Sequence, residues 1–219
     1  MKKIIMSHPW VQMWTKPKQT IASIIQEDEK KGFLILSFLY GFAQSFYFAQ
    51  YFSLGMVYEF WMNILLAAIF AVPVGVVYFS VSTYVIYLVG KVVRGKGSYH
   101  QIRAANAWSN VTQIASLAFV LPLILYFKNA YFIASFFQNP FEGGALFLVF
   151  FYLISQLVLS IWTFILFVLS LAEVQKFSVW RALLNIALVV LFYFVLILAI
   201  GEIITLTTSS NIAFFQGKI

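Results

Sequence analysis

Five long stretches of this chain contain no charged residue, and they constrain its fold more than any other feature. A helix needs about 20 consecutive apolar residues to cross the hydrocarbon core of a bilayer, and each stretch reaches that length. None of them alternates with the period of two that a membrane barrel strand requires. The charge-free stretches cover residues 32–58, 60–90, 104–127, 143–172 and 182–201.

The composition agrees with a chain built for a bilayer. Hydrophobic residues make up 63% and charged residues 10% of the 219 residues, whereas roughly a quarter of a soluble domain is charged. A soluble fold of this size would lack the polar exterior that it needs. We therefore predict an all-α fold: a polytopic integral membrane protein with five transmembrane helices in one bundle. The transmembrane domain is predicted to cover 32–219, with spans at about 33–52, 60–90, 104–127, 145–171 and 182–206.

The basic residues predict the orientation of these spans. With five spans, the N-terminal segment, the loop between spans two and three and the loop between spans four and five face one side. That side holds 12 of the 14 basic residues, and the positive-inside rule makes it the cytoplasmic side. We expect a multi-pass protein of the plasma membrane with its N-terminus inside and its C-terminus outside. The inner residues are Lys2, Lys3, Lys16, Lys18, Lys30, Lys31, Lys91, Arg94, Lys96, Arg103, Lys176 and Arg181, and the outer ones are Lys128 and Lys218.

Residues 1–31 are predicted to form a cytoplasmic, amphipathic N-terminal segment. Thr20 is a suitable cap for a helix whose apolar face carries Ile21, Ile24 and Ile25. Since the positive-inside bias already accounts for the net charge of +7, no nucleic-acid partner is expected.

Residues suited to chemistry are few. The chain has no cysteine and no metal-binding, nucleophile or phosphate-binding motif. No carboxylate lies at a predicted midplane, where a proton relay would need one. We therefore predict a protein that is not an enzyme, with no catalytic, cofactor-binding or metal-binding residues and no cofactor.

Five amide side chains form a candidate intramembrane polar cluster: Gln44, Asn106, Asn110, Gln113 and Gln156. An amide that faces lipid leaves its hydrogen-bonding groups unpaired, so these side chains are expected to face inward. The three glutamines lie near the middle of three different spans and are expected to meet. Two interpretations stay open: mutual hydrogen bonds that fix helix packing, or a hydrated midplane site for a ligand.

The loop between spans two and three is a second candidate site, because it contains Lys91, Arg94, Lys96 and Arg103. Each basic residue near an anionic membrane surface contributes on the order of 1 kcal/mol of attraction. The loop therefore has the character of a binding site for anionic lipid headgroups. The alternative is that its charges only set the topology.

The chain also contains two similar inner loops. Residues 96–106 and 176–185 both begin with Lys-x-Ser, continue to Arg-Ala and reach an asparagine three or four residues after the arginine. We hypothesise that spans two and three and spans four and five are parallel repeats, related by an axis along the membrane normal.

Four short motifs carry a resemblance to a known family. They are Trp14-Thr15-Lys16-Pro17-Lys18, Gly90-Lys91, Gly95-Lys96-Gly97-Ser98-Tyr99 and Ala172-Glu173-Val174-Gln175-Lys176-Phe177-Ser178. In this order, and with five spans, the chain resembles a short, bacterial-type member of the Ypt-interacting protein (Yip) domain family. Eukaryotic members act in vesicle trafficking and contact Rab-type GTPases through a longer N-terminal region. That region is missing here, so the resemblance implies fold and topology without implying a GTPase partner.

These observations favour a non-enzymatic, Yip-type membrane protein that serves membrane organisation or a trafficking-like scaffold role. Its expected partners are membrane lipids, including anionic headgroups, together with another protein or a second copy of the chain. The alternative function is a small transporter, channel or lipid-translocating protein.

Overall fold

A computed structural model describes residues 8–216 and confirms the all-α, polytopic fold: these residues form helices and no strand. Lys2, Lys3 and Lys218 lie outside the described residues. Four helices are long and apolar enough to cross a membrane, and a bent helix pair makes a fifth span if it is counted as one. In chain order the elements are α1 (Pro9–Thr15), α2 (Pro17–Glu27), α3 (Phe33–Tyr51), η1 (Leu54–Met56), α4 (Phe60–Val92), α5 (Tyr99–Ser109), α6 (Val111–Ala115), α7 (Leu117–Phe127), η2 (Lys128–Phe132), η3 (Phe136–Gln138), α8 (Gly143–Gln175) and α9 (Val179–Gln216).

The most extensive helix contact joins α3 and α4, and two glycines allow it. A Cβ atom added to Gly41 would lie 1.8 Å from the carbonyl oxygen of Ala71, and one added to Gly75 would lie 1.8 Å from that of Ser37. The two backbones therefore touch directly. Small residues serve this purpose in membrane helices, since close approach gives the packing that the lipid does not supply.

The third predicted span, 104–127, is not one helix. It is divided into α5, α6 and α7, and the pair Tyr99–Ala115 and Leu117–Phe132 is bent by 44°. At the first break the side chains of Ser109 and Asn110 both donate to the carbonyl oxygen of Asn106. Such side chains compete with the backbone for helix hydrogen bonds, which accounts for the break at Asn110. The 44° bend lies at the second break, at Ser116.

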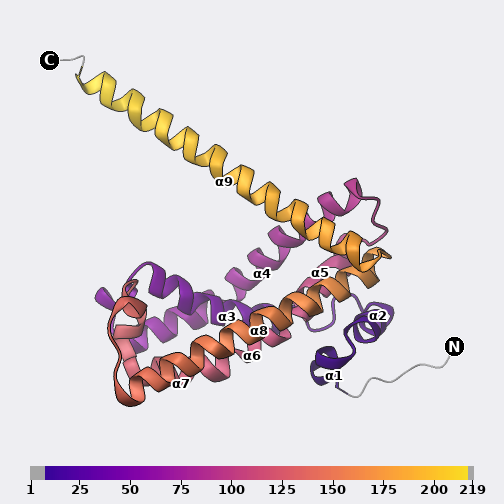
Figure 1. Cartoon of the computed structure of the whole chain (residues 1–219), viewed down its shortest axis with the longest axis horizontal. Helices are drawn as coiled ribbons and strands as arrows, with labels where there is room; N and C mark the ends of the chain where they lie inside the picture. The colour runs from indigo at the N-terminus through magenta and orange to yellow at the C-terminus, as the bar shows by residue number, and fades with distance from the viewer. Residues whose placement is uncertain (1–7, 217–219) are drawn as a thin grey trace.

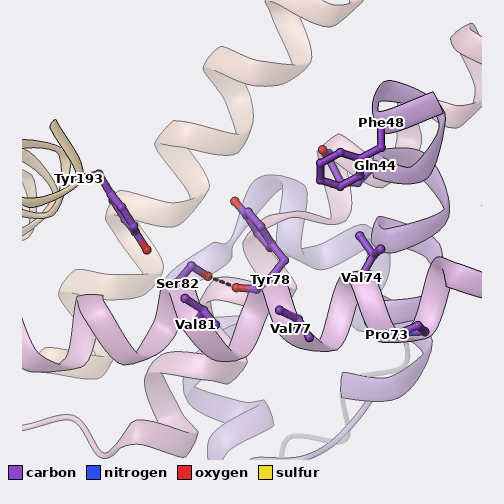
Figure 2. Close-up of a pocket in the computed structure, with 9 residues that line it drawn as sticks. All are labelled: Gln44, Phe48, Pro73, Val74, Val77, Tyr78, Val81, Ser82 and Tyr193. Carbon is purple, nitrogen blue, oxygen red and sulfur yellow. Dashed lines mark hydrogen bonds between the residues drawn. The ribbon is translucent and has the colours of Figure 1, made fainter. Parts of the chain in front are cut away.

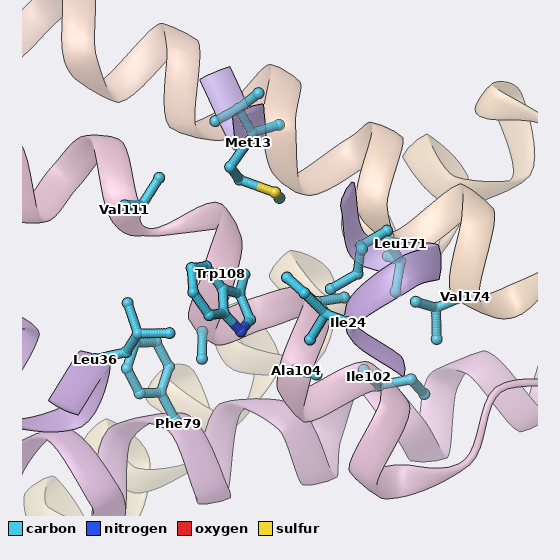
Figure 3. Packing of buried hydrophobic residues seen from close by; sticks show 14 of the residues in the cluster. Met13, Ile24, Leu36, Phe79, Ile102, Ala104, Trp108, Val111, Leu171 and Val174 are labelled. Carbon is cyan, nitrogen blue, oxygen red and sulfur yellow. The ribbon is translucent and has the colours of Figure 1, made fainter. Parts of the chain in front are cut away.

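The inner end of the molecule is held by one apolar core, in which Trp108 is the largest fully buried side chain (Figure 3). Met13 of α1 and Ile24 of α2 lie in this core, so the N-terminal helices pack into the bundle. Trp10 meets Trp108 edge to face, with ring centroids 5.5 Å apart. The indole nitrogen of Trp108 donates to the carbonyl oxygen of Lys31 at 3.0 Å, which satisfies its polar group.

Helix α9 leaves the other helices along its length (Figure 1). Its first turns are anchored, since Ala182 and Asn185 are fully buried against the bundle. Every side chain over 194–205 is exposed, and most of them are large and apolar. Such a surface belongs in lipid.

The two helix hairpins of the hypothesised repeat agree only in part. The first helices, α4 and α8, both have 33 residues, and the second arms begin with a serine cap, at Ser98 and at Ser178. The second arms then differ: α5–α7 is bent, whereas α9 runs unbroken for 38 residues. The correspondence extends through the first helix and the serine cap and ends there.

The glycine contact gives a direct stability test. Gly75→Ala should lower the free energy of unfolding by about 1–3 kcal/mol, because its methyl group must push α3 away from α4. Gly201→Ala is the matched control, since a Cβ atom at Gly201 would meet nothing within 4 Å. Thermal unfolding in detergent measures both variants, and equal stability of the two would contradict a packing role for the glycine.

Candidate functional site

Two of the three predicted glutamines meet in the bundle. The Gln113 side chain on α6 donates to Gln156 Oε1 on α8 at 3.2 Å. Gln156 Nε2 in turn donates to the hydroxyl of Tyr152, at 3.1 Å, and to that of Tyr47 on α3. The hydroxyls of Tyr47 and Tyr152 lie 3.0 Å apart and complete the network. Three helices are thus joined by amide and hydroxyl groups.

We call this network the midplane cluster (Tyr47, Gln113, Tyr152 and Gln156), and its side chains bond to one another. Its neighbours do the same, because the hydroxyls of Thr112 and Thr163 bond to each other at 2.6 Å. It contains no carboxylate or imidazole, so it offers hydrogen bonds rather than proton transfer. Mutual bonding is the arrangement expected of interhelical packing contacts.

The other predicted polar residues lie elsewhere. Asn106 donates to Ser82 Oγ at 2.9 Å and to Thr83 Oγ1 at 3.2 Å, which ties α5 to α4. Asn110 bonds back to the carbonyl oxygen of Asn106 at 2.8 Å. Gln44 does not join the midplane cluster, although Tyr47, one turn further along α3, does. Tyr47 and Tyr152 were not among the residues predicted from the sequence, which were all amides. Tyr152 precedes Gln156 by one helical turn, and this spacing indicates that the two side chains share a helix face.

Gln44 instead lines a lateral cavity of about 600 Å³ between α3, α4 and α9 (Figure 2). A second cavity, of about 500 Å³, adjoins it and shares Gln44 and Phe48. The first cavity is lined by Gln44, Phe48, Pro73, Val74, Val77, Tyr78, Val81, Ser82 and Tyr193. The two cavities are adjacent, and we refer to them together as the lateral groove.

The four basic residues between spans two and three divide into two groups. Lys91, Arg94 and Lys96 are exposed. Arg103 turns toward the protein: its guanidinium lies 4.2 Å from the ring centre of Phe33 and 5.7 Å from that of Tyr99. Arg103 therefore stabilises the junction of α3 and α5 by cation–π contact, and three charges remain for an external ligand.

The motifs quoted for the family resemblance come together at the inner end of the bundle. The side-chain oxygen of Gln175 accepts from the backbone of Gly97 at 3.2 Å, and its carbonyl oxygen accepts from Lys96 at 3.1 Å. A Cβ atom on Gly90 or Gly95 would lie within 2.2 Å of the Gln175 side chain. The glycines are needed because this glutamine occupies the space of their missing side chains. The sequence alone indicates no role for Gln175, because its contacts are with residues far away in the chain.

A smaller cavity of about 110 Å³ opens beside this junction, between α2, α5 and α8. Its lining mixes apolar and polar side chains, among them Ile25, Gln101, Glu173 and Lys176. Gln101 also donates to Glu29 at 2.9 Å, which links the end of the N-terminal segment to α5. The inner face is thus a folded surface made from both the N-terminal helices and the loops. Among the described residues, no group of histidine and acidic side chains is placed to hold a metal ion.

Comparison with known proteins identifies the family to which the chain belongs. The family model of the Yip1 domain matches residues 11–201, which covers all four motifs and most of the chain. No curated protein and no solved structure matches the chain.

The midplane cluster predicts a measurable coupling. Gln113→Ala and Gln156→Ala, made singly and together, should show a coupling free energy of about 0.6 kcal/mol, the usual size for hydrogen bonds between membrane helices. A double-mutant cycle of unfolding in detergent measures it. The pair Gln44→Ala and Gln113→Ala is the control and should be additive. Additivity of both pairs would mean that the 3.2 Å contact contributes no stability.

Proposed function

The chain belongs to the Yip1 domain family, and from this membership we propose that it is a non-enzymatic membrane protein with a trafficking-like or scaffold role. It organises the surrounding membrane by binding lipids and a membrane partner, either another protein or a second copy of the chain. The observation that carries this proposal is the midplane cluster, whose amides and hydroxyls bond to each other across three helices.

The distribution of cavities supports the same proposal. The 600 Å³ cavity lies between α3, α4 and α9, and the 500 Å³ cavity lies along α3 beside the outer loop; both linings are mainly apolar. A transporter binds its ligand near the midplane between the halves of the protein, where this protein has the midplane cluster. A small transporter or channel is therefore the second candidate function. Transport would require the hydrogen bonds of the midplane cluster to break so that a ligand can pass.

The inner face supplies the contact surface in this proposal. Lys91, in the last turn of α4, and Arg94 and Lys96, in the loop after it, are exposed, which suits the headgroups of anionic lipids. We assign this face to the cytoplasm on the positive-inside rule, in a multi-pass protein of the plasma membrane. No GTPase partner is proposed.

The orientation is testable because the chain has no cysteine of its own. In intact cells, a membrane-impermeant thiol reagent should label Asn139→Cys and should not label Ser98→Cys. Both positions are exposed, so a lack of labelling reports the side of the membrane; permeabilised cells serve as the control and should label both. Labelling of Ser98→Cys in intact cells would reverse the proposed orientation.

The scaffold role is tested by reconstitution in vesicles of phosphatidylethanolamine and phosphatidylglycerol. Release of carboxyfluorescein and movement of protons and potassium should match protein-free vesicles, both for the wild type and for Gln113→Ala. A saturable flux that Gln113→Ala abolishes would establish the transporter instead.

The same preparation tests headgroup binding, by mass spectrometry of the phosphatidylglycerol retained on purified protein. The triple variant Lys91→Gln, Arg94→Gln, Lys96→Gln should retain about a hundredfold less phosphatidylglycerol, since it removes three charges that each contribute on the order of 1 kcal/mol. Lys128→Gln, at the opposite end, should retain as much as the wild type. Equal retention by all three proteins would remove the loop from the proposal.

A further inference from the structure

The lateral groove runs from the middle of the molecule to its outer end. Its inner part is walled by Val74, Val77 and Val81 of α4, with Tyr193 of α9 opposite (Figure 2). Its outer part is lined by Gln50 and Tyr51 at the end of α3 and by Ala134 beyond α7. The groove is therefore apolar at depth and gains polar groups toward the end where α3 meets the outer loops.

Two polar side chains face this groove without a protein partner. Within the described residues, neither the Gln44 amide nor the Tyr193 hydroxyl makes a hydrogen bond, although both line the cavity. They come from different helices, α3 and α9. An amide in the hydrocarbon region requires a partner, and water does not reach that depth. Gln50 donates to the carbonyl oxygen of Tyr131 at 2.9 Å, which leaves its own side-chain oxygen at the outer part of the groove.

We propose that the lateral groove binds one phospholipid, with an acyl chain along the valines of α4, an ester group at Gln44 and a hydrogen-bond donor of its headgroup at the free side-chain oxygen of Gln50. The acyl chain fills the apolar inner part. The Gln44 amide donates to an ester carbonyl oxygen of the lipid, which supplies the hydrogen bond that the protein does not. The site differs from the basic loop in both position and chemistry, because it contacts the acyl chain and the ester group of the lipid and not the negative charge of the headgroup. It does not depend on the scaffold role.

The size of the groove favours a lipid over a helix of a second copy. Its deeper cavity, at about 600 Å³, lies in the range of roughly 300–1,000 Å³ that holds small ligands. A helix about 10 Å across and four turns long occupies roughly 1,600 Å³. Such a helix would have to displace α9, whose Tyr193 forms one wall of the groove.

The test uses phosphatidylethanolamine that carries a photoreactive diazirine on one acyl chain, with the full-length protein in lipid nanodiscs. After irradiation, peptide mass spectrometry should find adducts on the α4 segment 74–82 and near Tyr193. Val77→Trp fills the groove and should lower these adducts at least fivefold. Val72→Trp is the matched control: it adds the same side chain to an exposed position of α4 that does not line the groove, and its labelling should equal that of the wild type.

Further variants keep the result interpretable. Val81→Trp blocks the same cavity and should repeat the loss if Val77→Trp is poorly folded, which thermal unfolding reports. Gln44→Leu retains the volume of the side chain but removes the amide, and it should lower the adducts at least twofold. The triple loop variant Lys91→Gln, Arg94→Gln, Lys96→Gln should label normally, which separates this site from headgroup binding.

Three results would overturn the proposal. Equal labelling of Val77→Trp and Val72→Trp would mean that the adducts report bulk lipid. Unchanged labelling of Gln44→Leu would remove the ester contact. In the chain without cysteines, efficient disulfide formation between two copies of Val77→Cys, with no adduct at the groove, would show that a second copy occupies it.

Discussion

The direct backbone contact between α3 and α4 is the interaction on which the rest of the structure depends. Gly41 and Gly75 let the carbonyl oxygens of the opposite helix occupy the space of a side chain. This contact fixes the rotation of both helices. Leu36 of α3 and Phe79 of α4 then point into the inner core with Trp108 (Figure 3), while the valines of α4 point outward along the lateral groove. The core and the groove are two faces of one tightly packed pair.

The spans were predictable because their cause lies in the sequence itself. A bilayer forces every backbone group to find a partner within its own helix, so a charge-free stretch of sufficient length predicts a helix with little ambiguity. What the charge-free stretches did not predict is where a span is interrupted, because side chains compete with that rule. Ser109 and Asn110 bond to a backbone carbonyl and break the third span, and apolarity alone carries no trace of such a break. The divergence of α9 from the bundle could not be predicted from the sequence either, since a helix packed on protein and a helix surrounded by lipid are both apolar.

In the candidate site, the sequence predicted how deep each residue lies in the bilayer but not which way its helix is rotated. Sequence position gives the depth of a residue in the bilayer, and on that basis three glutamines were expected to meet. Whether two residues at one depth touch depends on how each helix is rotated and tilted, which the glycine contact and the break after α5 decide. Gln113 and Gln156 therefore meet, whereas Gln44 faces the groove. Tyr47 and Tyr152 complete the network because tertiary packing brings their hydroxyls to it.

Gln175 shows a further limit of the sequence: its motif was visible, but its contact with Gly97 joins residues far apart in the chain.

The divergence of α9 has a geometric consequence for the membrane that contains it. Near Ala182 the helix lies against the bundle, and toward Gln216 it stands apart from the other helices (Figure 1). The molecule therefore has a wedge-shaped outline, narrow in one leaflet and broad in the other. Lipids must fill the opening angle between α9 and α4, so the two leaflets hold different numbers of lipids around each protein.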